Sequence, residues 1–374
     1  MIQELLAYFN PLDYVGIWLF AAFSLAFVVS WGSFPAIFTI SETKHLMDEP
    51  NSRSVHSKKT PTLGGIAIFM SLVVVITTLG GLLETKILLL LLGGMTILFF
   101  LGLKDDLLVL SPSKKLMGQV LAAMVLIVFT DTRIVGFFGI LGINTLPYWV
   151  SVIFTLFVYV LIINAYNLID GVDGLAGSLA LFAAAAFTYI FLKTDDVSMA
   201  TVAVATMGSL IPFLRLNFSK HRKIFMGDTG SMIIGFMVAF FAVRFISEAQ
   251  GDIFSKYGNS APILALTIVF FPLLDTLRIF FIRAFIHRKS PFSADQNHLH
   301  HGFLKLGFTH KQTTGFIVLV NTLLFVICLL FKDFNIHLQF ALIIVIGTTL
   351  YSTVFIYNWL FKNNSKSEIM GQAQ

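Results

Sequence analysis

Two asparagines and two aspartates recur at every third position in the stretch NAYNLIDGVDGLAG, which covers residues 164–177. They are Asn164, Asn167, Asp170 and Asp173. Positions three apart drift by about 60° around an α-helix, so the stretch fits a helix end or a tight turn better than one helix face. A plain polar turn would explain these residue types. Two carboxylates without a lysine or arginine in the same connection favour a site that binds a cation.

A pair of adjacent acids, Asp105 and Asp106, ends an apolar run in LGLKDDLLVLSPSKK. Acids are disfavoured at the C-terminal end of a helix, where the helix dipole is negative, although Lys104 could neutralise them. The alternative is a pair of carboxylates that face a phosphate-and-metal site, with Lys114 and Lys115 as phosphate partners.

A third acid, Asp228, opens an apolar run in RKIFMGDTGSMIIGF together with Thr229 and Ser231. All three residue types are ordinary helix N-caps. A helix N-terminus also attracts phosphate, and Mg²⁺ typically takes only one or two protein oxygens beside phosphates and water. Both interpretations of Asp228, as a cap and as a metal ligand, are open at this stage.

Histidines gather in SPFSADQNHLHHGFLKLGFTHKQT, with His298, His300 and His301 close together and His310 further on. No cysteine accompanies them, and the carboxylates elsewhere favour a hard cation over zinc. Histidine can instead donate charge-assisted hydrogen bonds to phosphate oxygens. Upstream, Asp275 can form an ion pair with a nearby arginine or mark a functional site within the membrane.

The elements that position these residues are predicted from composition. The chain has 374 residues, of which 57% are hydrophobic and 12% charged, whereas about 25% are charged in an average soluble domain. A membrane-spanning helix needs about 20 mostly apolar residues. We therefore expect an all-α polytopic membrane protein, a single domain over residues 1–374, with about eleven transmembrane helices. The runs lie near 14–40, 64–81, 87–103, 116–130, 147–162, 175–192, 199–214, 232–247, 261–282, 313–331 and 336–361.

The distribution of basic residues predicts the orientation. Eighteen of the 25 lysines and arginines fall on one side, in the C-terminal tail and in connections near 41–63, 104–115, 163–174, 215–231 and 283–312. The positive-inside rule then places the N-terminus outside and the C-terminus in the cytoplasm. Every polar cluster described above lies on the cytoplasmic side. The net charge of +5 fits loops beside anionic lipid and not a nucleic-acid surface.

Four motifs, GLKDDLLVLSPSKK, NAYNLIDGVDGLAG, FMGDTGS and DQNHLHH, occur in this order and on one membrane face. They resemble those of the polyprenyl-phosphate N-acetylhexosamine-1-phosphate transferases (glycosyltransferase family 4), and the resemblance covers roughly residues 41–312. It implies transfer of GlcNAc-1-phosphate from UDP-GlcNAc to undecaprenyl phosphate at the cytoplasmic face of a bacterial inner membrane. UMP would leave, and lipid-linked synthesis of a cell-envelope glycan, such as O-antigen or a teichoic acid linkage, would begin.

The resemblance also distinguishes branches of the family. The His-x-His-His pattern at 298–301 is similar to the UDP-GlcNAc branch, whereas the peptidoglycan branch usually has three consecutive histidines. That branch often reads Asp-Asp-x-x-Lys, and this chain has Val109 at the lysine position. The phospho-MurNAc-pentapeptide translocase, or a relative that uses another UDP-N-acetylhexosamine, is the alternative. An ion-coupled transporter is a more distant one, because no inverted repeat is visible.

The resemblance implies a role for each matching residue. Mg²⁺, for which Mn²⁺ could substitute, would be held by Asn167 and Asp228. Asp173 would bond to uracil, with Phe225 stacked on the base. Asp105 and Asp106 would face the carrier-lipid phosphate, with Asp105 as the base. Diphosphate or sugar-phosphate oxygens would contact Lys115, His298, His300 and His301, while Asp170 would either support the metal or contact the nucleotide. The expected partners are UDP-GlcNAc, undecaprenyl phosphate and membrane lipids, with no nucleic acid; a homodimer is left open.

Overall fold

The computed structural model describes residues 12–44, 46–48, 60–250, 257–286, 288 and 298–371, with side chains throughout except at 259, 354 and 357–371. The basic segment around residues 51–59 and the first three residues of the DQNHLHH motif lie outside the described residues.

Almost all of the described chain is helical, as the composition predicts. The long helices are α2 (Val15–Thr43), α3 (Gly64–Leu79), α4 (Thr85–Leu108), α5 (Pro112–Thr130), α6 (Tyr148–Ile169), α7 (Leu175–Lys193), α8 (Val197–Asn217), α9 (Gly227–Glu248), α10 (Ala261–Ile268), α11 (Phe270–Phe281), α13 (His310–Leu330) and α14 (Ile336–Gly371). Shorter elements are η1 (Gly80–Leu82), η2 (Ile140–Gly142), η4 (Gly258–Ser260), η5 (Ile282–Ile286), α12 (Leu299–Lys305) and an antiparallel pair of two-residue strands, β1 (Met47–Asp48) and β2 (Thr60–Pro61).

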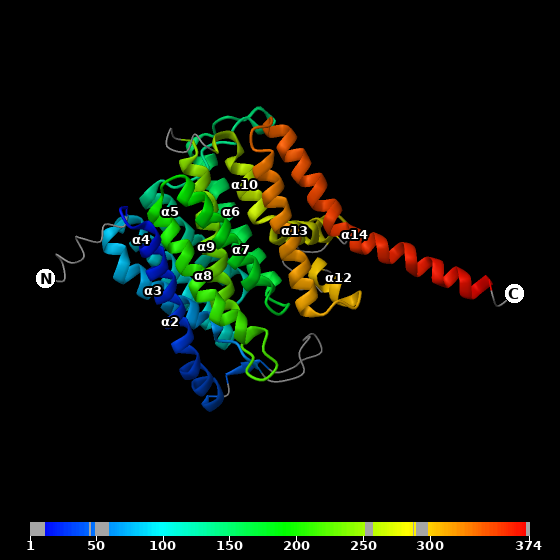
Figure 1. The fold of residues 1–374 in the computed structure, drawn as a ribbon, viewed down its shortest axis with the longest axis horizontal. Helices are drawn as coiled ribbons and strands as arrows, with labels where there is room; N and C mark the ends of the chain where they lie inside the picture. The colour runs from blue at the N-terminus through cyan, green and yellow to red at the C-terminus, as the bar shows by residue number, and fades with distance from the viewer. Residues whose placement is uncertain are drawn as a thin grey trace.

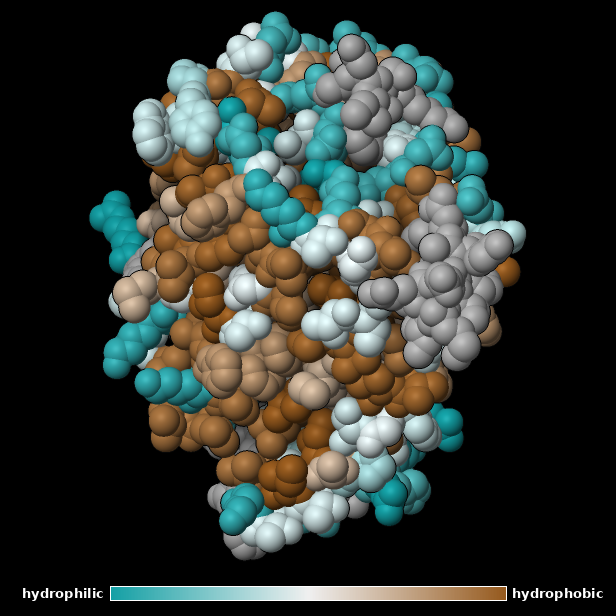
Figure 2. Space-filling view, turned by 90° about the vertical axis from the view of Figure 1, so that its left-hand side faces the viewer, coloured by the Kyte–Doolittle hydropathy of each residue, from teal (hydrophilic) through white to brown (hydrophobic). Residues whose placement is uncertain are grey.

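Within the described ranges, ten helices are long and apolar enough to cross a membrane, or eleven if the bent pair α10–α11 counts as one span. A broad apolar belt covers the middle of the surface in Figure 2, and hydrophilic residues gather at both ends. Apolar side chains that face outward in the middle of a bundle are stable only in hydrocarbon. The chain is therefore a multi-pass membrane protein.

Helix α9 lies at the centre of the bundle and packs against α3, α4, α6 and α7. In its most apolar window 94% of the residues are buried. Two glycines let neighbouring backbones reach its first turn. A Cβ atom on Gly102 of α4 would lie 2.4 Å from the Thr229 Cα, and one on Gly227 would lie 2.1 Å from the Thr62 carbonyl oxygen. Gly227 also has φ +73°, which glycine tolerates better than any other residue. The GDTGS motif therefore opens the helix whose apolar stretch is the most deeply buried of the described spans.

The apolar run at 261–282 is broken, which the sequence reading did not anticipate. Helices α10 and α11 meet at an angle of 77°. Pro272 explains the break, because its ring clashes with the carbonyl of the residue four positions earlier, Ile268, where α10 ends. Asn321 of α13 forms hydrogen bonds with the backbone groups that lose their helical partners at the break. Its amide donates to the carbonyls of Thr267 and Ile268, each at 3.0 Å, and its oxygen accepts from the Phe271 N–H at 3.1 Å.

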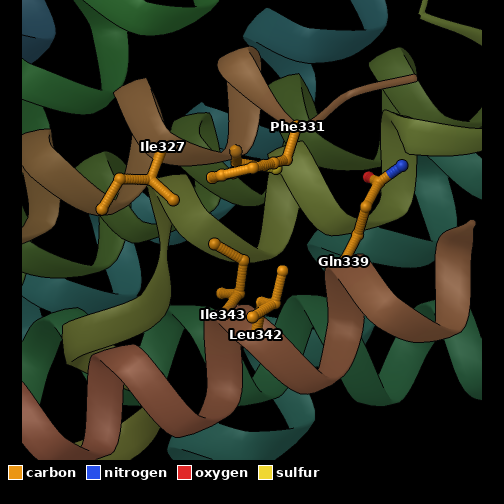
Figure 3. Close-up of a pocket in the computed structure, with 6 residues that line it drawn as sticks. Ile327, Phe331, Gln339, Leu342 and Ile343 are labelled. Atoms are coloured by element: carbon orange, nitrogen blue, oxygen red, sulfur yellow. The ribbon is translucent and has the colours of Figure 1, made fainter. Parts of the chain in front are cut away.

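The last two long helices, α13 and α14, form a seam at the far end of the bundle from the polar motifs, and α14 then extends away from the bundle (Figure 1). Ile327, Phe331 and Ile343 line a crevice in this seam that is too narrow for a water molecule (Figure 3). The single cysteine, Cys328, borders the same crevice and is buried. It is a packing residue there, as expected for a cysteine within an apolar run.

The orientation of the bundle is a prediction that a fusion can test. A reporter joined after Gln374 should be active only in the cytoplasm, and a tag before Met1 should be accessible from outside, because eighteen of 25 basic residues fall on one side. Protease protection in sealed inside-out and right-side-out vesicles provides the measurement. A C-terminus outside the cytoplasm would separate the polar motifs from any cytosolic nucleotide sugar.

Candidate functional site

The polar motifs converge at one end of the bundle. Helix α4 ends there and α5 begins, α6 ends and α7 begins, and α8 ends and α9 begins. In Figure 1 the loops that join these helices lie at the same end as α12. The convergence follows from the alternation of up and down helices, which brings every second connection to the same face.

A lysine and two carboxylates form the centre of the site. Lys115, in the first turn of α5, forms an ion pair with Asp105 of α4, and its Nζ lies 3.1 Å from the Asp228 Oδ2 of α9. The amide of Asn167, near the end of α6, donates to the other Asp228 oxygen and to the Ser231 hydroxyl at 2.9 Å. Four helices thus contribute to one cluster of Asp105, Lys115, Asn167 and Asp228.

The structure distinguishes the two lysines, Lys114 and Lys115, that follow Val109. The Val109 side chain is 87% exposed and its φ is +50°, an unusual value for a β-branched residue. The turn that contains it is held by Asp105, whose Oδ1 accepts the Leu110 N–H at 2.5 Å. Lys114 is exposed, whereas Lys115 reaches both carboxylates. Lys115, and not Lys114, therefore occupies the position beside the acids.

Asp106 has a different set of partners from the other acids. Its carboxylate accepts the N–H of Asp228 at 2.7 Å, the N–H of Thr229 at 3.0 Å and the Thr229 hydroxyl at 2.6 Å. These are donors of the first turn of α9, which no intrahelical carbonyl can satisfy. Asp106 therefore caps α9 from outside, and the positive end of α9 compensates for an acid at the negative end of α4. It follows that Asp228 is not the cap of its own helix.

Asp106→Ala should lower the free energy of unfolding by about 0.5–2 kcal/mol, the usual cost of losing a helix cap. Asp106→Asn should keep most of the wild-type free energy of unfolding. The reason is that an asparagine oxygen caps almost as well as a carboxylate. Thermal unfolding in detergent would measure both variants. If Asp106→Asn unfolds as early as Asp106→Ala, capping does not account for the conformation of Asp106.

Asp170, directly after α6, lies among the other acids. Burial, followed by the negative charges of Asp228, Asp106 and Asp173, holds the pKa of the Asp170 carboxyl well above its usual range. Such a shift records an excess of negative charge in a partly dry site. A cation placed among these oxygens would relieve it, and oxygen ligands of this type suit a hard divalent ion. The donor set therefore fits Mg²⁺, with Asp228 and Asn167 as the residues that would hold it.

A second group of residues lies beside the first. The Asp173 Oδ2 accepts from the Lys223 Nζ at 2.7 Å, and that Nζ lies 5.0 Å from the centre of the Phe225 ring. The Asp173 N–H donates to His310 Nδ1 at 3.0 Å, and its carbonyl accepts from the Thr314 hydroxyl at 2.9 Å. Lys223 lies in the basic connection near 215–231, and its residue type alone does not predict a contact with Asp173. Its position two residues before the expected stacking ring was the available signal.

The backbone around Phe225 is fixed by the segment before α3. The Phe225 N–H donates to the Pro61 carbonyl at 2.8 Å, and the Phe225 carbonyl accepts from the Gly64 N–H at 3.0 Å. Asn217, at the end of α8, joins the two sides by accepting the Gly174 N–H at 2.5 Å and donating to the Ile224 carbonyl at 2.7 Å. The loop that contains Asp173 and the segment that contains Phe225 are thus held together.

The histidines form a third group at the start of α12. His298 and His300 are buried, and both bond through Nδ1 to Asp275 of α11. Asp275 had been expected to pair with Arg278 or to mark a functional site, and its hydrogen-bond partners are these histidines. His301 lies against the acidic loop, since a Cβ atom on Gly171 would be 3.7 Å from its ring. Burial, with the charges of His300 and His298, lowers the pKa of His301 to about 4, so the ring is neutral at pH 7.

One expected polar residue lies outside the site. The Asn164 amide donates to the Gln119 Oε1 of α5 and to the Val160 carbonyl, both at 2.7 Å. Asn164 therefore ties α6 to α5, while Asn167, one turn later, faces the acids. The every-third spacing of the motif continues past the end of α6 at Ile169, so its later members lie in the following loop.

Comparisons with known proteins identify the family of the chain. A family model described as glycosyl transferase family 4 matches residues 88–246. The undecaprenyl-phosphate alpha-N-acetylglucosaminyl 1-phosphate transferase of Escherichia coli K12 is 32% identical over 75% of this chain and 74% of its own length. The decaprenyl-phosphate N-acetylglucosaminephosphotransferase of Mycobacterium leprae is 33% identical over 72% and 73%. The chain therefore belongs to glycosyl transferase family 4, the polyprenyl-phosphate N-acetylhexosamine-1-phosphate transferases.

Proposed function

We propose that this protein transfers GlcNAc-1-phosphate from UDP-GlcNAc to undecaprenyl phosphate and releases UMP, at the cytoplasmic face of a bacterial inner membrane. The observation that carries the proposal is the joining of Asp105, Lys115, Asn167 and Asp228 into one cluster at one end of four membrane-spanning helices. The second group, with Asp173, Lys223 and Phe225, lies beside it and suits a nucleotide base.

The carrier phosphate belongs at Asp105 and Lys115. The carrier chain cannot leave the bilayer, and these two residues lie where α4 and α5 reach the end of the apolar belt. Lys115 supplies a positive charge to the incoming phosphate, while Asp105 accepts its proton. The phosphate oxygen then attacks the phosphorus next to the sugar, the bond to the UMP oxygen breaks, and UMP leaves. Positioning and charge neutralisation dominate catalysis of phosphoryl transfer.

Bound at Asp228 and Asn167, Mg²⁺ would neutralise charge on the diphosphate. The chain's own residues arrange the rest. Asp106 fixes the first turn of α9 and so positions Asp228, and Ser231 holds the Asn167 amide at 2.9 Å. His298, His300 and His301 contact diphosphate or sugar-phosphate oxygens from the α12 side. Because His301 is neutral, its contribution is a hydrogen bond until a phosphate draws a proton onto the ring.

Asp173→Ala should weaken UDP-GlcNAc binding by roughly ten- to a hundredfold, the worth of a hydrogen bond to a charged group. Its Oδ2 is occupied by Lys223, which leaves Oδ1 to accept the uracil N–H. Calorimetry with UDP-GlcNAc, and competition with UMP, would measure the loss. Unchanged affinity for both ligands would remove Asp173 from the base site.

The function is tested by identifying the lipid product. The purified protein in vesicles with Mg²⁺ and undecaprenyl phosphate should convert UDP-GlcNAc to undecaprenyl-diphospho-GlcNAc and UMP, both identified by mass spectrometry. UDP-MurNAc-pentapeptide and UDP-GalNAc serve as the competing donors. A lipid product from UDP-MurNAc-pentapeptide alone would assign the protein to the peptidoglycan reaction instead.

A further inference from the structure

The carboxylate that supports the histidine group comes from a distant helix. Asp275 of α11 is fully buried. Its Oδ2 lies 2.7 Å from the His300 Nδ1 and 3.1 Å from the His298 Nδ1, and its Oδ1 accepts the Leu299 N–H at 2.6 Å. One side chain thus holds two imidazole rings and the backbone between them.

These contacts determine which ring nitrogens face the substrate. An ionised carboxylate only accepts hydrogen bonds, so each ring must carry a proton on Nδ1. The Nε2 atoms are then left for other partners, and the buried His300 Nε2 has none in the described part of the chain. A buried nitrogen without a partner is costly unless a ligand supplies one. The centres of the His300 and His301 rings are 4.4 Å apart, and His301 in turn lies beside Gly171 of the acidic loop. The His300 ring is therefore one residue away from that loop.

We infer that Asp275 is a positioning residue for the transfer reaction: it fixes His298 and His300 so that the His300 Nε2 meets a phosphate oxygen of the nucleotide sugar. A carboxylate behind an imidazole orients the ring and stabilises positive charge on it, as in the serine protease triad. We call the contacts of Asp275 with His298, His300 and the Leu299 N–H the clamp. The clamp is observed directly, whereas the identity of the phosphate rests on the proposed function.

The break between α10 and α11 makes the clamp possible. A straight helix through residues 261–282 would continue along the bundle axis. The 77° bend between Ile268 and Phe270 instead directs α11, and Asp275 with it, towards the start of α12. Asn321 stabilises the bend through three hydrogen bonds, and is therefore part of the support for the histidines.

The same three side chains could hold a metal ion, because their ligand atoms lie within 4.8 Å of one another. Two features favour direct hydrogen bonds among these side chains over a bound metal ion. Both Nδ1 atoms are at hydrogen-bond distance from one oxygen, and the other oxygen is occupied by the Leu299 N–H. Bound metal is accordingly an outcome that the experiment must detect.

A double-mutant cycle tests the clamp. Asp275→Asn should lower kcat by about ten- to a hundredfold, the range found when the partner behind a metal-bound histidine, the nearest analogue, is removed, with little change in KM for undecaprenyl phosphate. In a background that lacks both rings, His298→Ala with His300→Ala, the same change should alter kcat by less than about threefold, since contacting residues are not additive. Thr276→Val is the matched control, because Thr276 is buried on the same helix and its hydroxyl has no hydrogen-bond partner among the described residues.

Three results would overturn the inference: equal losses in both backgrounds, a loss only of folded protein with kcat unchanged, or a stoichiometric transition metal in the wild type that Asp275→Asn removes. The same cycle measured on the midpoint of thermal unfolding needs no substrate. A wild-type protein that fails to transfer GlcNAc-1-phosphate would therefore refute the proposed function. The coupling between Asp275 and the two histidines would still be measured, as a difference between unfolding midpoints.

A separate cavity of about 370 Å³ lies between α2 and the end of α8. One wall is apolar, with Trp31, Phe34 and Phe38, and the other is basic, with Arg215 and Arg222. The Arg215 guanidinium stacks 5.0 Å from the centre of the Trp31 ring, and no carboxylate in the described part of the chain pairs with either arginine. None of these residues belongs to the proposed transferase site.

We propose that this cavity binds the headgroup of an anionic phospholipid such as phosphatidylglycerol, with an acyl chain along the aromatic face of α2. Basic pockets between transmembrane helices on the cytoplasmic side suit such headgroups. Two arginines that pair with no carboxylate among the described residues supply the charge complementarity, and the apolar wall continues into exposed apolar residues of α2 such as Val28 and Ile40. Undecaprenyl phosphate shares this chemistry, but its phosphate must reach Asp105 and Lys115.

Phosphatidylglycerol added to protein in phosphatidylcholine nanodiscs should raise the midpoint of thermal unfolding. Arg215→Gln and Arg222→Gln should each weaken the apparent affinity about fivefold, the equivalent of about 1 kcal/mol per basic residue, whereas Lys220→Gln, in the same loop but outside the cavity, should not. Equal stabilisation of the double variant would refute the site. Stabilisation by undecaprenyl phosphate but not by phosphatidylglycerol would identify the cavity as a carrier-binding groove instead.

Discussion

Asp228→Asn should lower the rate of GlcNAc-1-phosphate transfer on the order of a thousandfold, because charge stabilisation by a bound divalent ion is worth several kcal/mol. The helix itself should survive. Asp106 caps α9, and an asparagine at position 228 keeps one oxygen that can accept from Lys115 or from Asn167. Initial rates over a range of Mg²⁺ concentrations, with thermal unfolding in parallel, would measure the effect. The apparent affinity for Mg²⁺ should fall along with the rate.

Asn167→Ala should weaken Mg²⁺-dependent transfer in the same direction, since Asn167 contacts the same carboxylate. Asp131→Asn is the control, because Asp131 is an exposed acid at the opposite end of the bundle that pairs with Arg133. Near-normal activity in Asp228→Asn would return Asp228 to a structural role in the first turn of α9. Loss of activity in all three variants would indicate damage to the fold.

Asp105→Asn should stop turnover while leaving UDP-GlcNAc binding largely intact, because the partner of Asp105 is the carrier phosphate and not the nucleotide. The change also removes the negative partner of Lys115, whose second contact with Asp228 at 3.1 Å remains. We expect the affinity for UDP-GlcNAc to change by less than about tenfold, below the cost of removing a charged hydrogen bond from the base. Calorimetry and single-turnover assays separate the two quantities.

The exchange of labelled UMP into UDP-GlcNAc distinguishes direct attack from a covalent enzyme intermediate. With direct attack, exchange requires the lipid product, and Asp105→Asn should abolish it. Lys114→Ala is the matched control, because Lys114 is the exposed neighbour of the lysine that contacts Asp105. Exchange by Asp105→Asn in the complete absence of polyprenyl phosphate would show that another residue accepts the phosphoryl group first.

Much of the architecture follows from the sequence alone, because crossing a bilayer is a local property. A run of about 20 apolar residues must be helical in hydrocarbon, where every backbone group needs an internal partner. The predicted all-α class and the number of spans are confirmed, and four ordered motifs were sufficient to identify the family. The side of the membrane and the role of each site residue stay predictions that the experiments above test.

The partner of each side chain depended on the tertiary structure, because residues of one type are distinguished only by what surrounds them. Asp105 and Asp106 are adjacent in the sequence, yet one pairs with Lys115 and the other caps α9. Asp275 lies three residues from Arg278 but holds two histidines that follow more than twenty residues later. Helical periodicity says which way a side chain points along its own helix; only packing against α5, α9 and α12 decides what it meets there.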